Sequence, residues 1–235
     1  IEKALANFRA NNGHLEINAL SEIIEYHENI MTDLFEGNTS HPIFETMTNL
    51  FLDLYLNLQE TGFDYDYQYD NTVSFGEMLS TTLISAYLNE CGIRNELIDA
   101  RDYIVTDHGF RSANPEWDDC RLRIEKLKSN ESVMYITQGF IASSVSPKTT
   151  TTLGREGSDF SAAIFANCLD AEELTIWKDV DGLRNADPKR FADTKKISHL
   201  SYFEAIELAF YGASVIHPKT LKPLQNKNIP LKVRS

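Results

Sequence analysis

Cysteine, basic charge and long apolar runs are all scarce in this chain of 235 residues. The three cysteines, Cys91, Cys120 and Cys168, lie far apart, which predicts neither a disulfide framework nor a zinc site and favours reduced thiols in the cytoplasm. No apolar run approaches the roughly 20 residues that a membrane-spanning helix needs. The start, Ile1 to Leu5, lacks both an initiator methionine and the layout of a signal peptide, so we expect the chain to begin inside a longer protein.

Basic residues are outnumbered by acidic ones, and the formal net charge is -13. Because polyphosphate backbones and anionic membranes select basic surfaces, we expect neither a nucleic-acid partner nor a membrane partner. An anionic small substrate is compatible with this charge only if a local basic site overrides it. The six histidines show no metal-ligand spacing with the cysteines, so no metal site made of protein side chains is predicted. The length fits one large α/β domain or two small ones.

Hydrophobic spacing predicts helices up to about residue 58, followed by an alternation of strands and helices. The predicted helices cover 78–91, 117–128 (with an N-cap at Asn114), 158–169 and 201–212, with a short one from Pro218. The predicted strands cover 97–98, 133–136, 174–177 and 229–233, and the apolar run 133–136 is expected to be buried on both faces. Aromatic and acidic residues alternate at 63–70, which is typical of an edge strand or a loop. This order of elements predicts a mostly parallel sheet covered on both faces.

One stretch, residues 149–163, has the composition of an anion site. A turn rich in threonine and glycine leads into a helix whose first turn carries Ser158 and Asp159. The unpaired N–H groups and the positive end of the helix dipole favour an anion there, and the planar fork of Arg155 suits a carboxylate or a phosphate. An ordinary capped helix with a surface arginine is the alternative that such generic spacing favours.

Two further segments are compatible with ligand binding but are not specific by themselves. Residues 177–189 lie at the carboxyl end of a predicted strand, the edge where open α/β sheets bind ligands, but taken alone they are better explained by turns at Asp181-Gly182 and Asp187-Pro188. Residues 74–77 are expected at the start of a helix, where Glu77 either binds an ammonium group or merely caps the helix.

Taken together and in this order, these segments resemble the aspartokinases of the amino-acid kinase superfamily over residues 74–234. The matching stretches read SFGE (74–77), TQGFIA (137–142), TTTLGREGSDFSAA (150–163), WKDVDG (177–182), ADP (186–188), SYFEAIELAFYGASVIHPKT (201–220) and IPLKVR (229–234). The DVDG turn occurs across the superfamily, whereas the TTTLGR-x-GSD and HPKT stretches are much more specific to aspartokinases. The resemblance implies an α/β fold, a three-layer α/β/α sandwich with extra N-terminal helices. It also implies a single kinase domain over 1–235, with an amino-acid lobe at about 1–145 and a nucleotide lobe at about 146–235.

The implied reaction is phosphorylation of the β-carboxylate of L-aspartate by ATP with Mg²⁺, the first step toward lysine, threonine and methionine. Aspartate and ATP are the implied partners, and the full-length protein is expected to form a homo-oligomer. By resemblance, Arg155 grips the α-carboxylate of aspartate, Glu77 holds its amino group, and Asp159 organises nearby basic groups. Arg155 and Asp159 are the expected catalytic residues, while Phe140, Gly157 and Ser158 complete the substrate pocket. The expected nucleotide contacts are Lys178, Asp179, Arg184, Lys189, Ser214 and Val215.

The nucleotide side departs from the family's pattern. Lys178 stands where the family usually has threonine, Arg184 where it has tyrosine, Lys189 where it has arginine, and Ser214 where it has lysine. We hypothesise that the three cations among these residues attract the triphosphate and compensate for the lysine that Ser214 replaces. The family's opening strand with its KFGGTS loop and its C-terminal ACT domains match no part of this chain.

Two other functions stay open at this point. One is another enzyme of the superfamily, a glutamate, acetylglutamate or UMP kinase, which would share the DVDG turn. The other is a catalytically weak regulatory subunit that binds an amino acid, which the altered nucleotide residues would suit.

Overall fold

The computed structural model describes residues 1–3, 5–6, 17–60, 62–130, 133–180, 182–186, 190–191, 193–211 and 215–235. The N-terminal part holds three long helices, α2 (Ile17–Leu34), α3 (Pro42–Gln59) and α4 (Tyr65–Glu90). The middle part contains β1 (Asn95–Ile98), α5 (Ala100–Tyr103), β2 (Val105–Thr106), α6 (Trp117–Ile124), the 3-10 helix η1 (Glu125–Asn130), β3 (Met134–Thr137), β4 (Ile141–Ser144) and β5 (Thr150–Thr152). The C-terminal part contains α7 (Gly157–Leu169), β6 (Leu174–Trp177), α8 (Tyr202–Phe210), α9 (Pro218–Lys227) and β7 (Leu231–Arg234).

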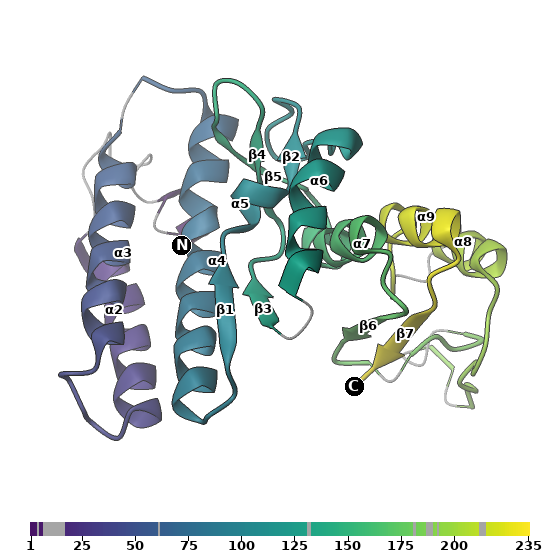
Figure 1. Ribbon diagram of the computed structural model, residues 1–235, viewed down its shortest axis with the longest axis horizontal. Helices are drawn as coiled ribbons and strands as arrows, with labels where there is room; N and C mark the ends of the chain where they lie inside the picture. The colour runs from purple at the N-terminus through teal and green to yellow at the C-terminus, as the bar shows by residue number, and fades with distance from the viewer. Residues whose placement is uncertain are drawn as a thin grey trace.

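The strands lie between helices, as expected for a layered α/β protein. In the described residues β1 pairs with β3, β2 with β4 and β6 with β7, all in parallel, while β5 runs antiparallel to β4. These short strands form separate hydrogen-bonded groups rather than one continuous sheet. Helix α4 contacts β4 and β5 from one side, and α6 and α7 contact β2 and β4 from the other (Figure 1).

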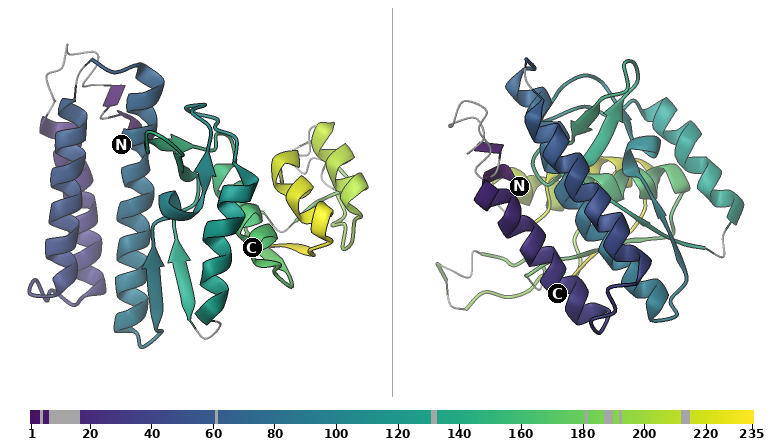
Figure 2. Two further views of the ribbon diagram at one scale, coloured as in Figure 1. Left: turned by 45° about the horizontal axis from the view of Figure 1, so that its top comes forward. Right: turned by 90° about the vertical axis from the view of Figure 1, so that its left-hand side faces the viewer.

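The packing joins the two predicted lobes through α7. Figures 1 and 2 show α2, α3 and α4 side by side at one end of the molecule and α8 and α9 at the other. Helix α7 lies between them and contacts both α6 and α9. One core cluster combines Ile104 and Cys120 with Leu153 and Ile164, so it crosses the expected boundary near residue 145. The division into lobes therefore stays a proposal.

Local sequence explains where several helices begin. His41 accepts a hydrogen bond from the Ile43 N–H at 3.2 Å, and Pro42 occupies the first turn of α3. Ser201 and Glu204 form the capping box of α8, as predicted. None of the helices in the described parts of the chain has the length and apolar character that crossing a membrane requires.

The expectation of an edge strand or loop at 63–70 is wrong, because these residues enter and form the first turns of α4. Asp64 caps the helix by accepting a hydrogen bond from the Asp66 N–H at 2.9 Å. Tyr65 and Tyr69 lie one turn apart, with ring centroids separated by 6.1 Å. Residues 74–77 consequently lie in the middle of α4 and not at its start, so Glu77 does not cap a helix.

Two smaller expectations also need correction. Asn114 does not cap α6; its side chain donates to Asp107 Oδ2 at 2.9 Å, and α6 begins at Trp117. Strand β3 is not buried on both faces, since Met134 is exposed and the rest of the strand is half-buried. Helix α8 ends at Phe210 with Tyr211 as its C-cap, directly before the predicted stop at Gly212, which lies outside the described residues.

Candidate active site

The centre of the candidate site is the N-terminus of α7. Strand β5 ends at Thr152, and the chain turns through Gly154, whose φ of 76° lies in the left-handed region that favours glycine. Glu156 is the N-cap of α7, has φ 54° and makes no side-chain capping hydrogen bond. The positive end of this 13-residue helix therefore has no capping side chain among the described residues and favours an anion.

Two glycines allow the loop before β4 to approach this helix end. A Cβ atom at Gly157 would lie 2.6 Å from Phe140 Cδ2, and one at Gly139 would lie 2.9 Å from the Ser158 Cα. Phe140 has φ 67°, and its N–H donates to Ser161 Oγ at 2.9 Å. The structure thus brings Phe140, Gly157 and Ser158 together, as expected for one pocket.

Arg155 lies between Gly154 and the N-cap of α7. Its side chain is exposed, and no carboxylate in the described part of the chain pairs with it. An unpaired guanidinium next to a helix N-terminus is suited to a bidentate carboxylate or phosphate.

Lys178 directly follows strand β6 and forms ion pairs with residues at the start of α7. Its N–H donates to the Arg234 carbonyl at 2.8 Å, which extends the pairing of β6 with β7. Its Nζ lies 2.8 Å from Asp159 Oδ2 and 3.7 Å from Glu156 Oε2, and all three side chains are largely buried. The one amine therefore offsets two carboxylates that would otherwise repel an anion bound at α7.

Glu77 lies on α4, the helix that contacts β4 and β5. Burial raises the pKa of its carboxyl group, and none of the described residues pairs with it. One turn later, Thr81 Oγ1 accepts a hydrogen bond from Gln138 Nε2 at 2.9 Å, and Gln138 directly precedes the Gly139–Phe140 turn. A half-buried carboxylate in this position is suited to an ammonium group.

The expected nucleotide residues that the structure describes have different partners. Arg184 Nη1 donates to the carbonyl and the hydroxyl of Thr194, each at 3.0 Å, whereas Lys178 pairs with acidic residues of α7. Asp179 is exposed, and Val215 packs against the core of β6, α8 and α9. Lys189 and Ser214 lie outside the described residues.

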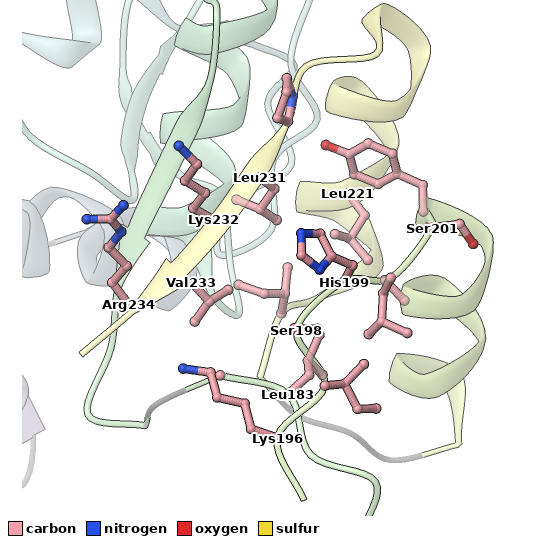
Figure 3. A pocket seen from close by; sticks show the side chains of 17 residues that line it. Leu183, Lys196, Ser198, His199, Ser201, Leu221, Leu231, Lys232, Val233 and Arg234 are labelled. Carbon is pink, nitrogen blue, oxygen red and sulfur yellow. The ribbon is translucent and has the colours of Figure 1, made fainter.

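A cavity of about 750 Å³ lies between β7, residues 182–183 and 196–202, and helices α8 and α9 (Figure 3). Leu183, Leu221 and Val233 contribute apolar walls, and Lys196 and Arg234 contribute positive charge. Its volume is in the range of small-molecule sites. It reaches the carboxyl end of β7, the edge of an open α/β sheet at which ligands bind.

The structure adds three charged residues that the sequence did not indicate. Glu156 faces Lys178, and Asp70 is a buried carboxylate that binds the end of β5. Lys219 Nζ lies 3.5 Å from the Leu153 carbonyl and 5.6 Å from the centre of the Phe160 ring. The HPKT stretch is the only signal that pointed to Lys219. No group of three or more potential metal ligands occurs among the His, Cys, Asp and Glu residues that the structure describes.

The model of the amino acid kinase family matches residues 17–235. The chloroplastic bifunctional aspartokinase/homoserine dehydrogenase 2 of Zea mays is 33% identical over 226 residues, which are 92% of this chain and 24% of that protein. Lysine-sensitive aspartokinase 3 of Escherichia coli is 38% identical over 168 residues, which are 71% of this chain and 37% of that protein.

A solved structure shows the same fold. E. coli aspartokinase III in complex with aspartate and ADP matches with a TM-score of 0.82 at 32% identity, over 94% of this chain and 50% of that chain. This chain thus spans between about a quarter and a half of the length of these relatives. Because the family match covers nearly all of the chain, the chain belongs to the amino acid kinase family, and its sequence and fold are similar to those of the aspartokinases named above.

Proposed function

We propose that this chain is the catalytic region of an aspartate kinase, which transfers the γ-phosphoryl group of ATP to the β-carboxylate of L-aspartate. The product, β-aspartyl phosphate, leads toward lysine, threonine and methionine. The observation that carries the proposal is the gathering of Phe140, Arg155 and Asp159 at the uncapped N-terminus of α7. The E. coli relative adds support, because its complex holds aspartate and ADP.

Aspartate binds between α4 and the start of α7 in this proposal. Arg155 receives the α-carboxylate through its planar fork, and Glu77 receives the ammonium group. Phe140, Gly157 and Ser158 form the wall near the β-carboxylate. The raised pKa of Glu77 is compatible with this role, since an ammonium partner would favour its ionised form.

The phosphates lie toward Lys178 and the carboxyl ends of β6 and β7. Lys178 neutralises Asp159 and Glu156, so the triphosphate meets an N-terminal helix dipole rather than two bare carboxylates. Asp179, Arg184, Lys189, Ser214 and Val215 stay proposed nucleotide contacts, of which Lys189 and Ser214 lie outside the described residues. The cavity beside β7 takes the base and ribose, with Lys196 and Arg234 adding positive charge.

Mg²⁺ enters the proposal with the nucleotide. Asp159 and Glu156 are already engaged by Lys178, so Mg²⁺ would be held mainly by the phosphates of ATP. When bound, the ion would offset the negative charge of the β- and γ-phosphates.

For the transfer itself, the protein has to position the two substrates and neutralise the negative charge of the phosphates. A β-carboxylate oxygen of aspartate forms a bond to the γ-phosphorus, while the bond from that phosphorus to the bridging oxygen breaks and ADP leaves with the electron pair. Because a carboxylate is already ionised at neutral pH, no general base is needed. Asp159 holds Lys178 in place and does not remove a proton.

The direct test is turnover by the full-length protein with ATP and aspartate, measured as ADP release and as hydroxamate formed from the acyl phosphate. Glutamate, acetylglutamate and UMP are offered in parallel, and we expect aspartate alone to react. Turnover of another acceptor would contradict the proposal. Calorimetric binding of aspartate and ATP without hydroxamate would instead indicate a regulatory subunit.

The remaining proposals concern the whole protein. We retain a homo-oligomeric full-length protein, an amino-acid lobe at about 1–145 and a nucleotide lobe at about 146–235. A cytoplasmic location is also retained, supported by three free thiols at Cys91, Cys120 and Cys168.

A further inference from the structure

A buried carboxylate that the proposed reaction does not use lies on α4. Asp70 is 0% exposed. Its Oδ2 accepts hydrogen bonds from the N–H groups of Arg111 at 2.9 Å and Thr152 at 2.8 Å, and its Oδ1 accepts one from the Thr152 hydroxyl at 2.8 Å. Burial outweighs these bonds and raises the pKa of Asp70. Because a buried carboxyl group needs hydrogen-bond donors, these three bonds fix Asp70 to both segments.

The residues that Asp70 binds lead directly to Arg155. Thr152 ends β5, and its carbonyl accepts the Ala113 N–H at 2.9 Å. Two residues later, a Cβ atom at Gly154 would lie 2.9 Å from the Arg111 carbonyl, so the segment that Asp70 holds also packs against Gly154. The chain that enters Arg155 is therefore held to α4 by the carboxylate of Asp70.

The same helix carries Glu77. Seven residues, about two turns and 10 Å, separate Asp70 from Glu77, which places both on one face of α4. Four residues further on, Thr81 is bonded to Gln138, and the Gln138 Oε1 accepts the Ala100 N–H at 2.8 Å. Glu77 thus lies between two attachments of α4 to the strands and loops of the site.

From this arrangement we propose that Asp70 is a positioning residue, which holds β5 against α4 and thereby sets the separation of Glu77 and Arg155. The inference rests on the proposed function, in which these two residues hold the two ends of aspartate. Displacement of a substrate-holding group by about 1 Å can reduce the catalytic rate about 100-fold. Loss of one buried carboxylate that positions such a group can therefore have a large effect on that rate.

A positioning role makes a different prediction from a purely structural one. If Asp70 only stabilises the fold, its loss affects all ligands alike. If it sets the separation of Glu77 and Arg155, its loss weakens the binding of aspartate more than the binding of succinate. Aspartate contacts both residues, whereas succinate lacks the amino group that Glu77 holds. The preference for aspartate over succinate therefore reports the separation itself.

The test uses the full-length protein with Asp70→Ala, Asp70→Asn and Thr152→Val. Asparagine can reproduce all three hydrogen bonds, because its carbonyl oxygen can accept both N–H groups and its NH₂ can donate to the Thr152 hydroxyl. Valine removes only the hydroxyl bond. Asp66→Ala is the matched control: Asp66 lies one turn earlier on α4 and contacts Arg111 Nη1 at 3.5 Å, without a bond to β5.

We expect Asp70→Ala to raise the KM for aspartate about tenfold or more, to change the KM for ATP by less than about twofold, and to reduce the preference for aspartate over succinate. Asp70→Asn and Asp66→Ala should stay near the unmodified protein, and Thr152→Val should show a smaller loss of the same kind. A folded Asp70→Ala protein with unchanged preference, or an Asp70→Asn protein as impaired as Asp70→Ala, would overturn the proposal.

If Asp70→Ala does not fold, the Thr152→Val variant provides the test. An unaltered preference of that variant for aspartate over succinate overturns the proposal. Failure of the unmodified protein to bind aspartate would refute the proposed function and this inference together. An unmodified protein that binds aspartate, together with variants of unaltered preference, would refute the role of Asp70 alone.

Discussion

At the scale of single residues, Arg155 carries the clearest consequence of the proposed aspartate site. Its exposed guanidinium has no carboxylate partner in the described residues, and it adjoins the N-cap of α7. Lysine cannot reproduce a bidentate fork, so Arg155→Lys should impair the enzyme almost as much as Arg155→Ala. We expect a loss of about 2–5 kcal/mol in kcat/KM for aspartate.

The measurement is steady-state kinetics of the full-length protein with aspartate varied at saturating ATP. Arg123→Lys is a suitable control, because Arg123 is a surface arginine of α6 that donates to the Asp102 carbonyl. Normal aspartate kinetics in Arg155→Lys would remove Arg155 from the site.

Lys178 supports a second prediction at this scale. Lys178→Met leaves Asp159 and Glu156 without their shared cation, so the phosphates would meet two uncompensated carboxylates. We expect the KM for ATP to rise and kcat to fall, together by about 10- to 100-fold in kcat/KM, with partial recovery in Lys178→Arg.

Lys148→Met supplies the comparison. Lys148 pairs with Asp102 at the surface, where ion pairs contribute little, and it does not line the cavity beside β7. It should leave ATP kinetics nearly unchanged. Equal effects of the two methionine variants would mean that Lys178 acts only through general charge.

At the scale of elements, Asp170 joins η1, α7 and α9. It ends α7 with φ 55° and pairs with Lys128 of η1 and Lys227 of α9. These lysines lower the pKa of Asp170 to about 2. Because the folded-state pKa lies below the ordinary value, the carboxylate adds stability above about pH 4, and this stability is lost as the pH falls toward 2.

Asp170→Asn should therefore lower the unfolding midpoint slightly at pH 6 and have less effect near pH 3. Asparagine tolerates the left-handed conformation, so the substitution isolates the charge. The effect should be small and should shrink in high salt, since the side chain is half exposed. Denaturant titrations at both pH values measure it, with the exposed Asp53→Asn on α3 as control. A constant difference between pH 6 and pH 3 would contradict the assignment.

At the scale of the whole molecule, α7 couples the two proposed lobes. Ile164 and Cys168 face the core shared with α6, whereas Ala163 and Ala166 face the core shared with α9. Removal of side-chain volume at the fully buried Ile164 should destabilise both sides of α7. We expect Ile164→Ala to cost about 2–4 kcal/mol and to reduce amide protection equally in α6 and α9.

Hydrogen exchange at increasing denaturant concentration measures this coupling. Leu122→Ala, at a largely exposed position on α6, should alter protection in neither helix. Loss of protection in α6 alone would show that the lobes open independently.

Much of this protein follows from local sequence. Helices α3, α7 and α8 could be predicted because their signals lie within a few residues of one another: the apolar period of α3, the glycine-containing turn before α7, and the capping box of Ser201 and Glu204. The anion-binding character of the α7 N-terminus was equally local, since it needs only a helix end and the neighbouring Arg155. Individual motifs in their order also indicated the family, which comparison confirmed.

Tertiary structure alone decided the first turns of α4 and the partners of the buried charges. The alternation at 63–70 suits a strand by local criteria, but the chain forms a helix there and buries Asp70 against Thr152, 82 residues away. Likewise, the partner of Lys178 depends on the packing of β6 beside α7, which brings its amine within 2.8 Å of Asp159 Oδ2. Short-range patterns determine caps and periodicity, but a buried carboxylate needs donors from distant segments, and only the packed fold brings those donors within hydrogen-bond reach.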